Sequence, residues 1–140
     1  MVEKGIQWNE AFITGIEVMD YHHEGMLEKI KELFDVLDKG QEIASIKALA
    51  VIFGSFLASH FTLEEMLQQK FAYPDFSSHS NQHRWLSDYF SDLIPLIDSK
   101  STSPDFVTVT RNFIMDWYHA YVSHINSQDK QLAEFLKTKL

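Results

Sequence analysis

Apolar residues recur at three- and four-residue steps along most of the chain, which is the spacing of amphipathic helices. The first such stripe lies between Asp20, a favourable N-cap residue, and Lys39-Gly40, where glycine favours a helix end. Its apolar members are Leu27, Ile30, Phe34 and Leu37. We therefore expect a first helix that begins near Asp20 and ends at Lys39-Gly40.

Two further stripes predict helices from about Ile43 to Phe71 and from about Ser77 to Ile94. Tyr73-Pro74 separates them, because a residue that precedes proline avoids the α region. We expect Pro95 to bend or end the second of these helices, since proline lacks the backbone N–H and clashes with the preceding turn.

A polar stretch at Ser99–Ser103 predicts the next loop. Ser103 and Pro104 then resemble an N-cap residue followed by proline at the first helical position, so the last helix should begin there and run toward Leu136. Four long helices with short connections predict an all-α fold, an up-down-up-down four-helix bundle.

The residues before the first helix carry apolar side chains and read as an extended arm that packs against the bundle. These side chains are Trp8, Phe12, Ile16 and Met19. No repeat or linker divides the chain, and 140 residues is the size of one ordinary domain. We expect a single domain over residues 1–140, with the arm at 1–19 and the bundle at 20–140.

Composition narrows the possible partners and chemistry. A formal net charge of −8 argues against a nucleic-acid surface or an anionic membrane surface. The absence of cysteine excludes disulfides, iron–sulfur clusters and thiolate zinc sites, and it fits a reducing cytoplasm. The sequence has no run of about 18 apolar residues and no signal-peptide core near Met1. We expect a cytoplasmic protein without membrane insertion.

Polar residues interrupt two of the predicted stripes at positions where apolar residues are due. His60 and Glu64 are four residues apart and share one face of the second helix, and His79 and His83 repeat that spacing on the third. A lone buried histidine is usually a hydrogen-bonded core residue, but two aligned pairs favour a metal. Imidazole nitrogen and carboxylate oxygen together suit iron, manganese or zinc.

The remaining histidines differ in their helical phase. His23 is the better candidate ligand of the first helix, because it lies in line with Leu27 and Ile30. His22 is rotated about 100° away and is expected at the helix edge. His119 is expected to be a partly exposed residue of the last helix, without a role in metal binding.

Several motifs, in chain order, resemble those of the hemerythrin family. They are Trp8, Thr14-Gly15-Ile16, Asp20-Tyr21-His22-His23, His60-Phe61-Thr62-Leu63-Glu64-Glu65, Tyr73-Pro74, His79, His83 and His124-Ile125-Asn126-Ser127-Gln128-Asp129. The resemblance covers nearly the whole chain and implies a four-helix bundle, an architecture for which myohemerythrin is one of the standard examples.

The resemblance also implies a non-haem di-iron centre. The ligands that it implies are His79, His83 and His124 for one iron, His23 and His60 for the other, and Glu64 and Asp129 as bridges. An oxo or hydroxo group from solvent would complete the bridge. In the family, the iron with two histidines keeps one coordination position open, and dioxygen binds there.

One spacing and three side chains depart from the family pattern. His124 and Asp129 are five residues apart, or about 140° around an ideal α-helix, so a π-bulge or the reach of the carboxylate has to reconcile them. The family often has glutamine at the position of His22 and methionine at that of Gln68. Its tryptophan usually stands four residues before the last histidine, whereas Trp117 stands seven before it.

The predicted function is reversible dioxygen binding by an oxygen carrier, store or delivery protein that is not an enzyme. The alternatives are an oxygen or redox sensor with a separate partner, and a di-iron enzyme that handles peroxide or nitric oxide. A ferritin-like site is disfavoured, because no glutamate stands three residues before any histidine. The His-Glu-x-x-His pattern of zinc hydrolases is also absent.

Overall fold

Helices make up nearly all of the computed structural model, which describes residue 6 and residues 8–140. The helices are α1 (Glu17–Asp38), α2 (Ile43–Lys70), α3 (Phe76–Ser91), α4 (Leu93–Lys100), α5 (Phe106–His124) and α6 (Lys130–Lys137). A 3₁₀ turn, η1 (Glu10–Phe12), precedes α1, and a π-helical turn, η2 (Ile125–Asp129), joins α5 to α6.

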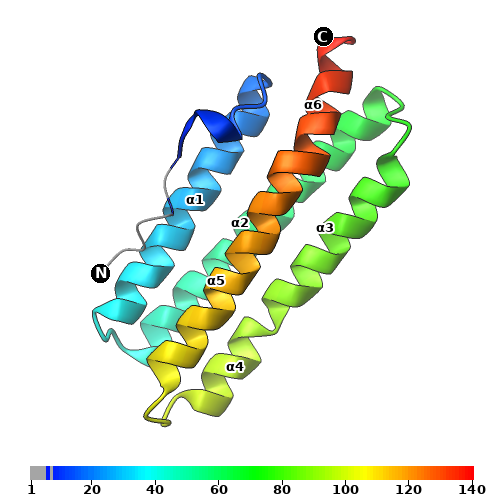
Figure 1. Ribbon diagram of the computed structural model, residues 1–140. Coiled ribbons are helices and arrows are strands. Elements are labelled where there is room, and N and C mark those ends of the chain that lie inside the picture. Colours follow the sequence, from blue (N-terminus) through cyan, green and yellow to red (C-terminus); the bar gives the residue numbers. More distant parts are fainter. Residues whose placement is uncertain (1–5, 7) are drawn as a thin grey trace.

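These elements form four antiparallel legs: α1, α2, α3 with α4, and α5 with η2 and α6 (Figure 1). The legs close into a ring, because α1 contacts α2 and α5, and α3 contacts the same two helices from the other side. The prediction of an all-α, up-down-up-down four-helix bundle is therefore confirmed.

The first helix begins at Glu17, three residues before the predicted start at Asp20. Asp20 acts from inside the first turn: its carboxylate accepts hydrogen bonds from the Thr14 backbone N–H and hydroxyl, both at 2.8 Å, and from the Gly15 N–H at 3.2 Å. The carboxylate thus fixes the chain that enters the helix, in place of the predicted N-cap.

The arm before α1 packs against the bundle, as its apolar side chains predicted. Phe12 and Ile16 are buried, whereas Met19 belongs to α1, so the arm ends at Ile16 and contains the η1 turn. The first five residues and Gln7 of the predicted arm lie outside the described residues.

The third leg breaks at Asp92, before the proline that was expected to bend or end it. Pro95 lies in the first turn of α4, where its missing N–H has no carbonyl to bond, and the helix then continues to Lys100. The predicted helix end at Ile94 was therefore wrong, because α3 ends at Ser91 and α4 continues the leg. The loop that follows begins at Ser101 and ends at Asp105, two residues later at each end than the predicted Ser99–Ser103 stretch.

The last leg begins two residues later than the sequence suggested. The Phe106 N–H donates to the Ser103 carbonyl at 3.1 Å, which closes a turn with Pro104 at its second position. Asp105 is the N-cap residue, and the Ser103 hydroxyl contacts its carboxylate. The prediction of Ser103 as N-cap was wrong, because proline is equally suited to a β-turn.

Two apolar clusters fill the interior. The larger involves α1 to α5 and η2, and the smaller consists of Ile16, Met19, Tyr73, Leu132, Ala133 and Leu136. On α1, Met26 belongs to the large cluster and Met19 to the small one. On the last leg, Ile125 belongs to the large cluster and Leu132 to the small one. Each of these helices therefore has a short stretch between the two clusters.

By length and composition alone, α2 (Ile43–Lys70) is the one described helix that could cross a membrane. The core helix of a soluble protein passes the same test, so the finding is weak evidence. In the bundle, α2 lies between α1 and α3 and buries His60 and Glu64.

Two of the connections use the same helix-ending motif, in which one residue adopts positive φ. After α1, the Gly40 N–H donates to Leu37 O and the next N–H to Val36 O, with φ +68° at Gly40. After α2, Ala72 occupies the equivalent position with φ +54°, and the Tyr73 N–H donates to Gln68 O at 2.8 Å. Ala72 is strained at this φ because its Cβ crowds the backbone, whereas glycine has no Cβ.

Replacing Ala72 by glycine is expected to raise the free energy of unfolding by about 0.5–1 kcal/mol, because glycine adopts positive φ without a Cβ clash. Gly40→Ala is the matched control: an added Cβ meets no atom within 4 Å, so backbone strain alone should lower stability by about 1 kcal/mol. Urea unfolding measures both. An unchanged or lower stability in Ala72→Gly would contradict the assigned strain.

Candidate metal centre

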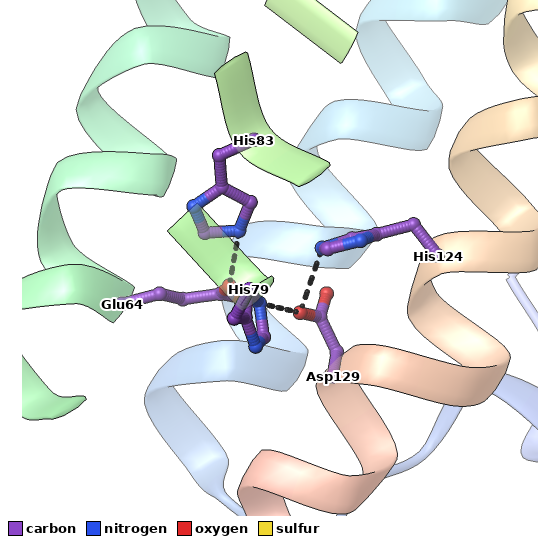
Figure 2. Close-up of side chains that lie close together, drawn as sticks. All are labelled: Glu64, His79, His83, His124 and Asp129. Carbon is purple, nitrogen blue, oxygen red and sulfur yellow. Dashed lines mark hydrogen bonds and ion pairs between the residues drawn. The ribbon is translucent and has the colours of Figure 1, made fainter. Parts of the chain in front are cut away.

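All seven predicted ligands meet in the stretch between the two apolar clusters, and each is at most 2% exposed. They come from all four legs: His23 from α1, His60 and Glu64 from α2, His79 and His83 from α3, His124 from α5, and Asp129 from η2. Figure 2 shows five of them, with the three imidazoles turned toward the two carboxylates.

The Glu64 carboxylate faces histidines on both sides. Its Oε2 lies 2.9 Å from His60 Nε2 and 3.4 Å from His23 Nε2. Its Oε1 lies 3.1 Å from His83 Nε2 and 3.3 Å from His79 Nε2. One oxygen thus faces a pair of histidines on α1 and α2, and the other faces the two histidines of α3.

The two oxygens of the Asp129 carboxylate also face different histidines. Its Oδ1 lies 2.9 Å from His79 Nε2 and 3.0 Å from His124 Nε2, and its Oδ2 lies 2.9 Å from His23 Nε2. The histidines therefore form a trio, defined as His79, His83 and His124, and a pair, defined as His23 and His60. Both carboxylates lie between the pair and the trio.

The π-helical turn η2 explains how Asp129 reaches this position. Hydrogen bonds in a π-helix connect residues five apart, so Asp129 returns to the face of His124. Of the two ways to reconcile this spacing, the structure contains the π-bulge. Such single-turn bulges inside α-helices are frequent at functional sites.

The donor set fits a metal. The Nε2 atoms of four histidines (His23, His60, His79 and His124), Glu64 Oε2 and both Asp129 oxygens each lie 2.9–3.4 Å from another atom of this set, but among the described residues none of them has a partner in hydrogen-bonding geometry. Buried polar atoms are costly without partners, and a cation would satisfy these together. Two groups could each hold one ion: the trio with Glu64 and Asp129, and the pair with the same carboxylates.

The charges of the cluster are strongly coupled. Burial alone would lower the pKa of His23 and His79, but the Asp129 and Glu64 carboxylates outweigh it and raise these pKa values to about 10 and about 9. Burial would raise the pKa of Glu64 and Asp129, but the surrounding imidazoles hold both below their ordinary values. A metal that binds here takes the place of imidazole protons at neutral pH.

Outer contacts orient two of the imidazoles. His83 Nδ1 lies 2.8 Å from Glu65 Oε2, and the Ser80 hydroxyl donates to the other Glu65 oxygen at 3.2 Å. Phe61 stacks on the His83 ring at a centroid distance of 3.9 Å.

His22 is half-buried at the helix edge, but its Nδ1 lies 3.2 Å from His60 Nδ1, a contact that the helical phase did not reveal.

His119 lies outside the cluster, on the exposed face of α5, as expected. Two further buried residues lie near the cluster: Gln68, which the sequence showed only as a departure from the family's methionine, and Tyr121, which was not identified from the sequence. The Gln68 side-chain amide, one turn after Glu64, and the Tyr121 hydroxyl have no hydrogen-bond partner among the described residues. Burial, Asp129 and Glu64, in that order, raise the pKa of Tyr121. Its position three residues before His124, on the same helical face, was the available signal.

The comparisons with known proteins agree with this arrangement. Residues 14–136 match the family described as the hemerythrin HHE cation binding domain. A bacteriohemerythrin of Pseudomonas aeruginosa is 32% identical over 76 residues, which cover 54% of this chain and 49% of that protein. A myohemerythrin of Theromyzon tessulatum is 30% identical over 77 residues, which cover 55% of this chain and 58% of that protein. The alignments span about half the length of these relatives. Since the family match covers most of the chain, the protein belongs to the hemerythrin family.

Proposed function

We propose that the seven clustered side chains hold two iron ions and that the protein binds dioxygen reversibly, as an oxygen carrier, store or delivery protein. The observation that carries this proposal is the division of the histidines into a trio and a pair, with both carboxylates between them. The names of the two relatives support it, although their alignments reach only about half of this chain.

Each side chain has a defined part in the proposal. The trio would hold one iron and the pair the other, and Glu64 and Asp129, which face both groups, would neutralise the charge of the two ions. Iron is one of the metals that such a mixture of imidazole and carboxylate suits. When bound, the iron pair supplies two exchangeable electrons and, on the side with fewer histidines, a coordination position for an external ligand.

The rest of the bundle keeps water away from this position. The two apolar clusters lie on either side of the seven side chains, and each of these side chains is at most 2% exposed. A dry apolar shell slows water entry and proton leakage, which favours release of the bound gas over its reduction.

The ligand chemistry favours a carrier over an enzyme. Five imidazoles and two carboxylates give a histidine-rich site, unlike the carboxylate-rich sites of ferritin-like di-iron proteins. We propose the cytoplasm as its location, because a chain without cysteine fits a reducing compartment.

The first test combines metal analysis with visible absorption on one sample, which is reduced without oxygen, exposed to air and then evacuated. We expect about two irons per chain and a coloured band that appears in air and fades under vacuum. A colour that arrives once and never reverses would instead favour a redox sensor or an enzyme. A protein that takes up no iron would exclude the proposal.

Variants of the ligands test the site itself. His79→Ala or His124→Ala should lower the iron content toward one or none per chain, because each removes a nitrogen from the trio. His119→Ala is the matched control on α5, and its iron content and spectrum should equal those of the unmodified protein. Full iron content in either trio variant would remove that histidine from the ligand set.

A variant of Glu65 tests whether the carboxylate beside His83 contributes to metal binding. Glu65→Ala is expected to weaken metal binding by about 10- to 100-fold, because His83 loses the carboxylate that fixes its ring and tautomer. Competition with a chelator measures the affinity. Glu134→Ala, an exposed glutamate paired with Lys137, should leave it unchanged. Equal affinities in the two variants would contradict a role for Glu65.

A further inference from the structure

Tyr121 buries a hydroxyl that makes no hydrogen bond to any other described residue. Tyr121 is 0% exposed, and its oxygen has no hydrogen-bond partner among the described residues. Buried tyrosine hydroxyls usually have a partner, because the loss of water is otherwise uncompensated. A phenylalanine would bury the same ring without that cost. The hydroxyl therefore has a hydrogen bond to offer that no described residue accepts.

The ring that carries this hydroxyl is held in place from one side. Tyr121 stacks on Trp117 at a centroid distance of 5.2 Å, with 16° between the ring planes. Trp117 is itself anchored, because its indole N–H donates to the Leu86 carbonyl at 2.9 Å. A rigid ring presents its hydroxyl in one direction, which is the requirement for a hydrogen bond of defined geometry.

Tyr121 lies on the side of the histidine pair. Its ring meets the His23 ring edge-on, with 6.3 Å between centroids and 80° between planes. Tyr73 takes the corresponding position on the other side, with its ring 6.3 Å from that of His79 in the trio.

We propose that the Tyr121 hydroxyl donates a hydrogen bond to the small ligand, dioxygen or an anion of similar size, that binds on the side of the histidine pair. This inference rests on the proposed di-iron function. A ligand that gains electron density from the metal is a strong acceptor, and a hydrogen bond to a charged acceptor is about twice as strong as a neutral one. Tyr121 would thus retain the ligand and set its release rate.

The two tyrosines provide a matched pair for the test. Three iron-loaded, oxidised proteins are compared: the unmodified chain, Tyr121→Phe and Tyr73→Phe. Each is titrated with sodium azide, a small anion, and binding is followed by the visible absorption band of the azide complex. Tyr121→Phe should weaken azide binding about tenfold, the usual effect of one hydrogen bond to a charged group. Tyr73→Phe should stay within about twofold, because its ring lies beside the trio.

A second measurement does not depend on affinity. The azide stretching frequency, recorded by infrared spectroscopy, should shift between H₂O and D₂O in the unmodified protein and in Tyr73→Phe, and the shift should be absent in Tyr121→Phe. Only a hydrogen-bond donor to the ligand produces this pattern, whereas a packing role for the ring would leave the shift in place.

The possible failures are distinguishable. Failure of the unmodified chain to bind iron would overturn the proposed function, and with it this inference. With about two irons per chain in all three proteins, equal azide affinities or an equal loss in both variants would overturn only the role of Tyr121. An iron–phenolate absorption band lost in Tyr121→Phe would also overturn it, since Tyr121 would then be a metal ligand.

Discussion

Five imidazoles and two carboxylates are buried in the centre of the bundle, and the rest of the fold depends on the balance of their charges. Each is costly to remove from water, and each carboxylate lies against histidines of more than one leg. The four legs are therefore tied to one relative register. Separating any leg would leave buried charges without their partners, which is more destabilising than the loss of an equal apolar contact.

The cluster has two unequal sides, and the surrounding side chains differ accordingly. On the side of the trio, Phe61 stacks on the His83 ring, and the Glu65 carboxylate contacts Nδ1 of the same ring. The pair meets His22 at the helix edge and the buried ring of Tyr121. The trio thus has a stacked ring and a carboxylate beside it, whereas the pair lies near a tyrosine hydroxyl that has no hydrogen-bond partner among the described residues.

The described part of the N-terminal arm packs on the turn that carries Asp129. Its η1 turn packs against η2, the π-helical turn that carries Asp129, and the Lys130 ammonium donates to the Ala11 carbonyl. At the other end of the arm, Asp20 holds Thr14 and Gly15 against the start of α1. The arm thus covers the one irregular turn of the last leg, where the backbone hydrogen bonds depart from the α-helical pattern.

The sequence by itself determined the helical elements and the alignment of His60 with Glu64 and of His79 with His83, because helical spacing places residues four apart on one face whatever surrounds them. The positions of His124 and Asp129 came only from the resemblance to the hemerythrin family, because their spacing of five does not fit an ideal α-helix. Local spacing could not reveal that Asp20 binds the chain that enters the helix, or that the third leg breaks before Pro95. It allowed the π-helical turn without requiring it. The contacts of His22 and Tyr121 were decided only in three dimensions, since they join different legs of the bundle, and no periodicity along one helix encodes a distance to another.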